Sequence, residues 1–179
     1  MATNWKNRLT RWQPHREGEQ QFCIAHLHPF SFTLELPATD ELPAKAVEIR
    51  VGFSNHTFTR NRKTEDGEAR FYADRTFCHE RYPLSHSLPG IIKSLDGRKC
   101  FHANQENYFI VELAGGREYW VFFDVRNVGE PSAVLLFVQS AYPANAASVS
   151  VPHGRRRKKV GFRVLVNYAL RGERPKPPP

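Results

Sequence analysis

Long apolar runs and paired cysteines are missing from this 179-residue sequence. No stretch approaches the roughly 20 consecutive apolar residues that a membrane-spanning helix needs. The basic N-terminal segment, MATNWKNRLTRW, is not followed by an apolar stretch, so it does not resemble a secretory signal. The three cysteines (Cys23, Cys78 and Cys100) are an odd number at wide spacings, which argues against a disulfide framework. We therefore predict a cytoplasmic protein that does not associate with membranes.

Sequence motifs that hold phosphates, cofactors or metals are also absent. The Gly115-Gly116 pair lacks the spacing of a P-loop or dinucleotide-binding loop, and no G-x-S-x-G motif or readable Ser–His–Asp set occurs. Cysteine and histidine lie near one another in three clusters: Cys23-His26-His28, Cys78-His79 and Cys100-His102. None of these has the C-x2-C or H-x3-H spacing typical of zinc sites. We expect no metal and no cofactor, while convergence of the three clusters in space stays open.

Phenylalanine is abundant, with thirteen residues against a single methionine, and this favours a layered β core. Alternating apolar and polar residues predict strands at 30–36 and 47–53, the second open to continuation through 55–59. Later strands are predicted at 108–113, 118–125, 133–142 and 160–168. Glycine-containing turns at 115–116 and 129–132 join three of them into an antiparallel meander.

One short helix is predicted within residues 84–95. Ser87 suits its N-cap, Pro89 its first turn and Gly97 the position after its end. Its apolar stripe consists of Leu88, Ile91, Ile92 and Leu95. The predicted fold class is α+β and mostly β: a twisted antiparallel meander sheet with one or two short helices packed on one face.

The positive charge of the sequence lies in its C-terminal segment. Residues 152–179 contain nine basic residues and one acidic residue, which account for the whole net charge of +8. Such a cluster attracts polyanions and releases counterions from the phosphates it neutralises, although a solvated segment that maintains solubility is the alternative. We predict a loosely ordered lead over 1–20, one globular domain over 21–170, and a proline-rich basic tail over 171–179.

Several residues resemble those of bacterial and phage toxin nucleases. They are Arg81-Tyr82, Ser85, Leu88–Ile92, Tyr108, Tyr119–Phe123 and Val138–Tyr142. On these residues the chain resembles the barnase–EndoU–colicin–RelE (BECR-like) superfamily. That resemblance implies a short helical part before a meander sheet, a ribonuclease site on the sheet, and a small antitoxin protein as inhibitor.

Cleavage of RNA needs no metal, because the 2′-hydroxyl attacks the adjacent phosphorus. The enzyme supplies a base, an acid and a cation that stabilises the negative charge on phosphorus. Asn55–Arg60 offers such groups. If the strand continues here, His56 and Arg60 share a face with Phe58 and face away from the core. An exposed strand end with incidental polar residues is the alternative.

A second candidate cluster spans residues 74–82. It contains Arg75, His79, Arg81 and Tyr82, and it precedes a helix N-terminus, where free N–H groups bind anions. The alternative is a charged connector whose side chains pair at the surface. Ser140 and Tyr142 end an apolar strand, on the same face as Val134, Leu136 and Val138, where polar groups often mark a cleft. Tyr142 alternatively caps the core with its hydroxyl in water.

These observations together predict a metal-independent, toxin-like endoribonuclease. His56 or His79 is the expected base or acid, Arg60 and Arg81 hold phosphate, and Tyr142 stacks on a base or donates a proton. The residues expected to contact RNA (tRNA, mRNA or rRNA) are Arg75, Tyr82, Ser140, Arg155, Arg156, Arg157, Lys158 and Lys159. The rival reading is a non-catalytic module of a phage or defence system that binds nucleic acid or protein. That module keeps the basic segment but needs no acid–base pair.

Overall fold

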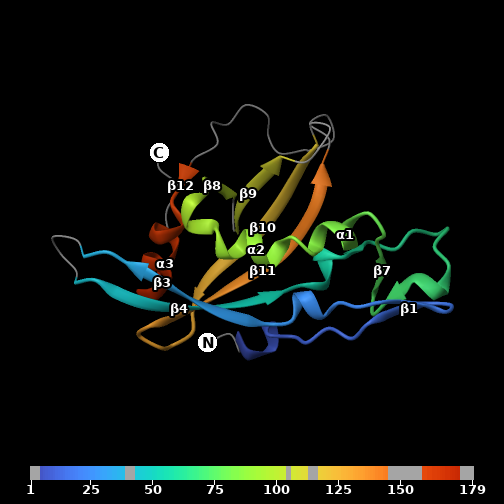
Figure 1. Cartoon of the computed structure of the whole chain (residues 1–179), viewed down its shortest axis with the longest axis horizontal. Helices are drawn as coiled ribbons and strands as arrows, with labels where there is room; N and C mark the ends of the chain where they lie inside the picture. The colour runs from blue at the N-terminus through green and yellow to red at the C-terminus, as the bar shows by residue number, and fades with distance from the viewer. Residues whose placement is uncertain (1–4, 39–42, 104–105, 113–116, 145–158, 174–179) are drawn as a thin grey trace.

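A seven-stranded sheet forms the centre of the protein, in a computed structural model that describes residues 5–38, 43–103, 106–112, 117–144 and 159–173. Its strands are β3 (Phe30–Leu36), β4 (Lys45–Phe53), β8 (Cys100–Ala103), β9 (Glu106–Glu112), β10 (Glu118–Asn127), β11 (Ala133–Ala144) and β12 (Lys159–Val160). They are ordered β12-β8-β9-β10-β11-β4-β3 (Figure 1). The predicted α+β, mostly-β fold class is confirmed.

The predicted meander is present in strands β8 to β11, which are successive antiparallel neighbours. β11 then lies parallel to β4, so the sheet is mixed rather than wholly antiparallel. Turn residues predict pairing between strands that follow one another in sequence. The β4–β11 pair joins strands separated by a long connection, which local sequence patterns do not encode.

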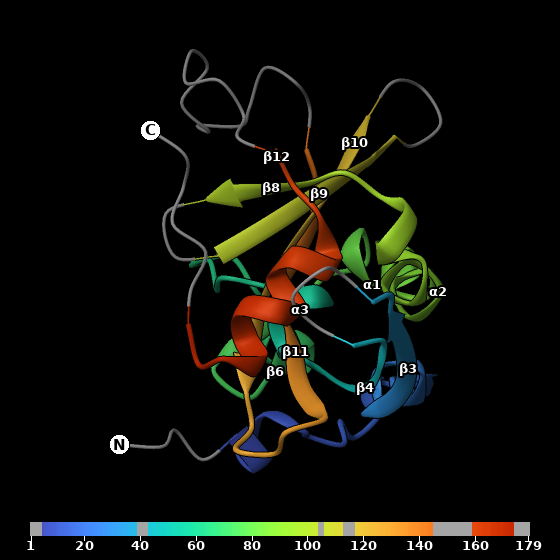
Figure 2. The same ribbon diagram turned by 90° about the vertical axis from the view of Figure 1, so that its left-hand side faces the viewer.

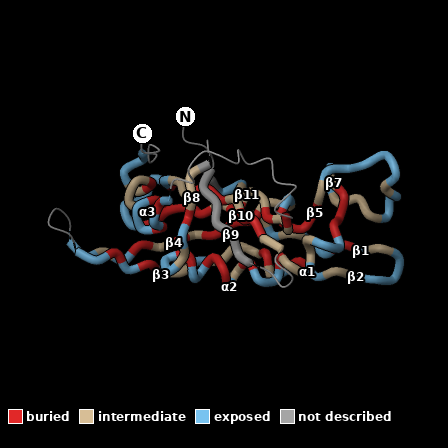
Figure 3. The backbone as a smooth tube through the Cα atoms, turned by 90° about the horizontal axis from the view of Figure 1, so that it is seen from above, coloured by how far each residue is buried: buried red, intermediate tan, exposed pale blue. Residues whose placement is uncertain are grey.

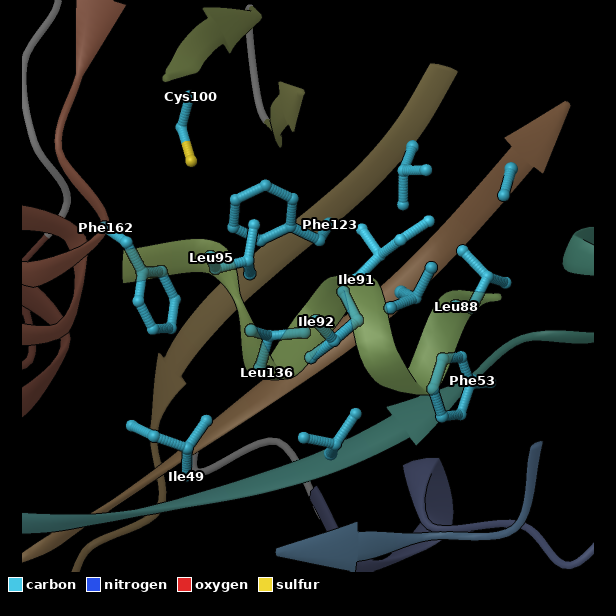
Figure 4. Close-up of a cluster of buried hydrophobic side chains, with 14 of the residues drawn as sticks. Ile49, Phe53, Leu88, Ile91, Ile92, Leu95, Cys100, Phe123, Leu136 and Phe162 are labelled. Carbon is cyan, nitrogen blue, oxygen red and sulfur yellow. The ribbon is translucent and has the colours of Figure 1, made fainter. Parts of the chain in front are cut away.

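Three α-helices pack on one face of this sheet: α1 (Arg81–Ser85), α2 (Leu88–Lys93) and α3 (Phe162–Leu170). The predicted apolar stripe is confirmed, because Leu88, Ile91, Ile92 and Leu95 are all buried. Figure 4 shows the stripe above the sheet, beside Phe123 of β10 and Leu136 of β11, with Phe53 of β4 near Leu88. Each buried side chain of this size contributes about 1.5–3 kcal/mol. No helix of the described ranges is long and apolar enough to cross a membrane.

The predicted helix over 84–95 is interrupted. α1 ends at Ser85, α2 begins at Leu88, and the 3-10 helix η5 (Leu95–Gly97) follows. Pro89 lies in the first turn of α2 as predicted. Ser87 holds the predicted N-cap position, but its hydroxyl donates to the Leu84 carbonyl at 2.7 Å and makes no capping hydrogen bond. Gly97 belongs to η5, so its predicted role after the end of the helix is wrong.

The predicted strand over 160–168 is wrong beyond Val160. Phe162, Leu165, Val166 and Ala169 have helical spacing and form the buried stripe of α3. Its last carbonyls, Ala169 O and Leu170 O, each accept a 3.0 Å hydrogen bond from the side-chain amide of Asn127. Gly172 adopts the left-handed conformation (φ 71°) that ends many helices. The β-branched valines in this segment suggested a strand, but burial of the helical stripe outweighs that propensity.

The prediction of a loosely ordered N-terminal segment over 1–20 is also wrong for residues 5–20. The 3-10 helix η1 (Trp5–Arg8) is followed by a hairpin of β1 (His15–Glu17) and β2 (Gln20–Phe22). Trp12 donates from Nε1 to the Phe53 carbonyl at 3.0 Å, and Leu9 packs against the sheet. His15 is 3% exposed and stacks on Phe77 with ring centroids 4.3 Å apart. Apolar and aromatic contacts therefore hold a segment whose composition is polar.

The N-terminal segment passes close to the sheet at Gly52 of β4. A Cβ atom at this position would clash with the Arg8 carbonyl oxygen. We expect Gly52→Ala to displace η1 and to lower the free energy of unfolding by about 1–3 kcal/mol. Gly90→Ala in α2 is the matched control, since nothing lies within 4 Å of its Cβ position. Alanine should stabilise that helix slightly. Equal unfolding curves for the two variants would contradict the prediction.

A three-stranded sheet lies beyond the C-terminal end of β4, at the end of the molecule opposite α3 (Figure 1). In Figure 2 the molecule is seen from the side of α3, which therefore lies in front. Its order is β5 (Thr59–Arg60), β7 (Arg75–Phe77), β6 (Phe71–Tyr72). The remaining 3-10 helices are η2 (Ala25–Leu27), η3 (Asn55–Thr57) and η4 (Glu68–Arg70). Between β5 and η4 the chain is largely exposed, whereas β7 is mostly buried (Figure 3).

The predicted continuation of the second strand through 55–59 is wrong. The Ser54 N–H donates to the Val138 carbonyl, and the Ser54 hydroxyl accepts from the His56 N–H. This side-chain bond turns the chain into η3 instead of extending β4. Phe58 is consequently fully buried, and His56 is exposed.

Candidate functional site

An open hollow of about 510 Å³ lies beside the end of β11. Side chains from η3, β5, β7, α1, β11 and the loop after β5 line it: His56, Arg60, Asn61, Lys63, Arg75, Arg81 and Ser140. We call this site the cationic hollow, because four of its seven lining residues are arginine or lysine. No carboxylate is among them.

Pairing between β5 and β7 creates the cationic hollow from the two clusters predicted separately. Arg60 pairs with Thr76, and Thr59 with Phe77, in antiparallel register. This brings Arg75, at the start of β7, beside η3 and its His56. The sequence predicted the residue types in each cluster, and the structure joins His56 and Arg60 with Arg75 and Arg81.

Arg75 and Arg81 are held by uncharged acceptors. Arg75 donates from Nε to the Thr59 hydroxyl at 2.8 Å and from Nη1 to the Asn61 side-chain oxygen at 2.7 Å. Arg81 donates from Nη1 to the carbonyls of His56 and Thr59 at 2.9 and 2.8 Å. Neither guanidinium forms an ion pair with a carboxylate in the described part of the chain. Desolvation lowers the pKa of both, so an anion in the hollow would meet fixed, poorly hydrated positive charge.

Arg60 differs from these two arginines because it has a carboxylate partner. Its guanidinium donates to both oxygens of Asp66, whose side chain is only 2% exposed. Asp66 also accepts from the Lys63 N–H and the Thr76 hydroxyl, each at 2.8 Å. The hydrogen bond from Arg60 is the main reason why the pKa of Asp66 lies well below its usual range. Arg60 therefore fixes the loop that carries Lys63, and its charge is compensated.

His56 is the only histidine among the lining residues that the structure describes. Partial desolvation lowers its pKa below the usual 6.5, the charges of Arg75 and Arg81 lower it further, and Asp74 acts in the opposite direction. The imidazole is therefore neutral near pH 7. A neutral imidazole has a nitrogen that accepts a proton, which is what a general base requires.

The same electrostatics predict how His56 titrates. We expect its NMR-determined pKa to rise when inorganic phosphate is added, because a nearby anion stabilises the imidazolium form. Arg75→Gln should also raise this pKa, because it removes a neighbouring positive charge. A His56 pKa unchanged by both phosphate and Arg75→Gln would exclude anion binding beside this residue.

A β-bulge decides where Ser140 and Tyr142 face. Phe122 pairs with Ser140, but the next residue, Phe123, pairs with Val138, so Gln139 is an extra residue in β11. An extra residue moves all following side chains to the opposite face of the strand. The prediction that Ser140 and Tyr142 share a face with Val134, Leu136 and Val138 is therefore wrong. Ser140 reaches the cationic hollow, and the Tyr142 ring lies 5.2 Å from Arg81 Cζ.

The predicted site residues His79 and Tyr82 lie outside the cationic hollow. His79 contacts Glu17 at 3.2 Å and packs edge-on against Phe22 and Phe77. The Tyr82 hydroxyl donates to the Cys23 carbonyl at 3.0 Å, and its ring packs against Phe22. Both side chains project from the segment that carries Arg75 and Arg81 but join the aromatic cluster around β1 and β2. The prediction that they share a site with the arginines does not agree with the structure.

The basic segment predicted to bind RNA is described only at its end. Arg155, Arg156, Arg157 and Lys158 lie outside the described residues, as do 174–179 of the tail. Lys159 begins β12 and pairs with Phe101 of β8.

The three cysteine–histidine clusters occupy different surroundings. His26 Nε2 lies 2.7 Å from the Ser85 hydroxyl, and its ring stacks on His86. Cys78 and Cys100 are buried and Cys23 is exposed, all as free thiols. Within the described ranges, no three His, Cys, Asp or Glu side chains form a group that holds a metal ion.

Sequence reasoning missed three residues that build the cationic hollow: Asn61, Lys63 and Asp66. They lie in the charged segment 61–68, where Asp66-Gly67 predicts a loop or hairpin tip. The available signal was the order of charges in this segment, where Arg60, Arg62 and Lys63 are followed by Glu65 and Asp66, which favours a loop folded on its own ion pair.

Comparison with known proteins gives one match. A family model described as the YjaZ family matches residues 14–170. This range includes both edge strands of the seven-stranded sheet, β3 and β12, and all the lining residues named above for the cationic hollow. The match also begins before residue 20, in agreement with the ordered N-terminal hairpin. No curated protein and no solved structure matches the chain. The chain therefore belongs to the YjaZ family.

Proposed function

We propose that this protein is a metal-independent endoribonuclease of the toxin type, related to the BECR-like nucleases. The observation that carries the proposal is the convergence of neutral His56 with Arg75, Arg81 and Lys63 around one hollow. Preorganised cations aimed at a phosphate stabilise the negative charge that develops on it during cleavage. The proposed setting is the cytoplasm, where tRNA, mRNA and rRNA are available.

The proposed reaction uses groups of the chain and of the RNA alone. His56 takes the proton of the 2′-hydroxyl, and the 2′-oxygen forms a bond to the adjacent phosphorus. The bond from phosphorus to the 5′-oxygen breaks, and that oxygen receives a proton from the Tyr142 hydroxyl. Arg75 and Arg81 contact the non-bridging oxygens, whose charge grows as the phosphorus becomes five-coordinate. The products are a 2′,3′-cyclic phosphate and a 5′-hydroxyl.

Incubation of purified protein with RNA in EDTA tests this proposal. We expect fragments that end in a 2′,3′-cyclic phosphate, and no cleavage at a site where the 2′-hydroxyl is replaced by hydrogen. In a bacterial host, expression of the wild type should slow growth, and a small antitoxin protein should restore it. RNA left intact under these conditions would contradict the proposal.

One observation favours the rival function, a non-catalytic nucleic-acid-binding module. Among the described residues, the lining of the cationic hollow includes a single histidine, since His79 lies elsewhere, and no carboxylate. Binding by phosphate contacts alone needs no proton transfer. Salt-sensitive binding of RNA without cleavage would favour this module over the ribonuclease.

A further inference from the structure

The sheet carries a row of aromatic rings beside the cationic hollow. Trp120 and Phe122 of β10 are nearly parallel, with centroids 6.1 Å apart and planes at 27°. Phe122 and Tyr142 of β11 are 5.7 Å apart with planes at 20°. Phe101 of β8 packs against the same cluster. These four residues are called the aromatic row below.

Strand register explains why these rings share one face. Trp120 pairs with Tyr142, and Phe122 pairs with Ser140. Directly opposed residues project to the same side of a sheet. Phe122 and Phe101 both pair with residue 108 of the intervening strand β9. The line from Phe101 to Ser140 therefore crosses four strands, or about 14 Å at the usual strand spacing.

The aromatic row is continuous with the cationic hollow. Ser140 stands at the end of that line and lines the hollow. Arg81 also lines the hollow, and its guanidinium lies over the Tyr142 ring at 5.2 Å. At the other end of the line, Lys159 pairs with Phe101. The face thus has aromatic rings between positive charges.

Exposure distinguishes the roles of the rings. Phe101, Phe122 and Tyr142 are partly exposed, whereas Trp120 is 1% exposed and packs beside Phe122. Ring centroids 5.7 Å apart exceed the roughly 3.5–4 Å of face-to-face contact. Phe122 and Tyr142 are therefore offset, and neither ring covers the whole face of the other.

We infer that the aromatic row selects single-stranded RNA as the substrate and excludes the RNA duplex. Unpaired bases stack on aromatic side chains with little regard to sequence, and a four-stranded sheet accommodates two or three of them. In a duplex the bases stack on one another and are not available to the rings. The strand would lie across the sheet with bases on Phe122 and Phe101 and a phosphate in the cationic hollow. This inference rests on the proposed ribonuclease function.

Binding measurements in a His56→Ala background test the inference, because RNA should stay uncut there. Fluorescence anisotropy compares a labelled single-stranded oligouridylate with an RNA duplex of matched length. We expect the single strand to bind at least about tenfold more tightly, and Phe122→Leu to weaken its binding about tenfold. Phe32→Leu, at the partly exposed Phe32 of the opposite edge strand β3, is the matched control and should leave binding unchanged.

The outcomes separate this inference from the proposed function. The inference about the aromatic row is wrong if single strand and duplex bind equally, or if a folded Phe122→Leu variant binds like its parent. Neither result contradicts cleavage of RNA by the wild type. If the wild type binds single-stranded RNA through Phe122 but never cleaves it, the role of the aromatic row in binding is supported and the proposed ribonuclease function is refuted. Should Phe122→Leu fail to fold, Phe101→Leu takes its place with the same expectation.

Discussion

Replacing His56 with alanine should lower the rate of RNA cleavage by about 10²–10⁴-fold, the usual contribution of a positioned base. His56 is exposed and its side chain supports no element of the fold, so unfolding free energy should change by less than about 0.5 kcal/mol. RNA affinity should change little, since the phosphate-binding cations remain. Single-turnover cleavage, anisotropy and thermal unfolding measure the three quantities.

The matched control for this variant is His79→Ala. His79 is also an exposed histidine, and it comes from the segment that supplies Arg75 and Arg81, but it lies outside the cationic hollow. It should retain the wild-type cleavage rate. Equal loss of activity in both variants, or none in either, would contradict the assignment of His56 as the base.

Replacing Arg81 with methionine should have the second large effect, because this guanidinium serves two purposes. Its Nη1 holds the carbonyls of His56 and Thr59, and its charge faces the cationic hollow. We expect cleavage to fall about 10²–10³-fold, as when one donor to a transition-state anion is removed. The free energy of unfolding should fall by about 1–3 kcal/mol, because two carbonyls lose their donor.

Salt dependence separates the charge of Arg81 from its structural role. Loss of one phosphate contact should reduce the slope of log affinity against log salt by about 0.7 for a single strand. Arg81→Lys should keep this slope but lose part of the activity, because an ammonium does not reproduce the guanidinium geometry. Arg163→Met on α3, which breaks the exposed pair with Asp96, controls for net charge. An Arg81→Met variant with wild-type slope and cleavage would exclude this residue from the site.

Sequence patterns predicted the strands well where one face of the strand is buried. The range 30–36 agrees residue for residue with β3, whose alternation follows from burial on one side. The predicted strand over 160–168 is wrong beyond Val160, because residues 162–170 form the helix α3 although the valines there favour a strand. The apolar residues there also have helical spacing, and packing of that stripe on the sheet chose the helix.

The candidate site was predicted by residue type rather than by position. His56, Arg60, Arg75, Arg81 and Ser140 were all identified from sequence, and all line the cationic hollow. Their convergence depends on the register between β5 and β7, which no local pattern specifies. His79 and Tyr82 look equally suitable in sequence, but aromatic packing around β1 and β2 draws them elsewhere.

The sequence by itself determined the fold class, the meander and the kinds of side chain available for binding an anion. These properties depend on local alternation, turn residues and composition, which short segments express independently. Tertiary structure alone decided which of those side chains meet. One extra residue in β11 turned Ser140 and Tyr142 away from the core, and the Asp66 carboxylate fixed the loop of Lys63. The bulge depends on the pairing of β10 with β11, and the Asp66 carboxylate is also tied to Thr76 of β7. Hydrogen bonds between separate elements form only when the chain has folded.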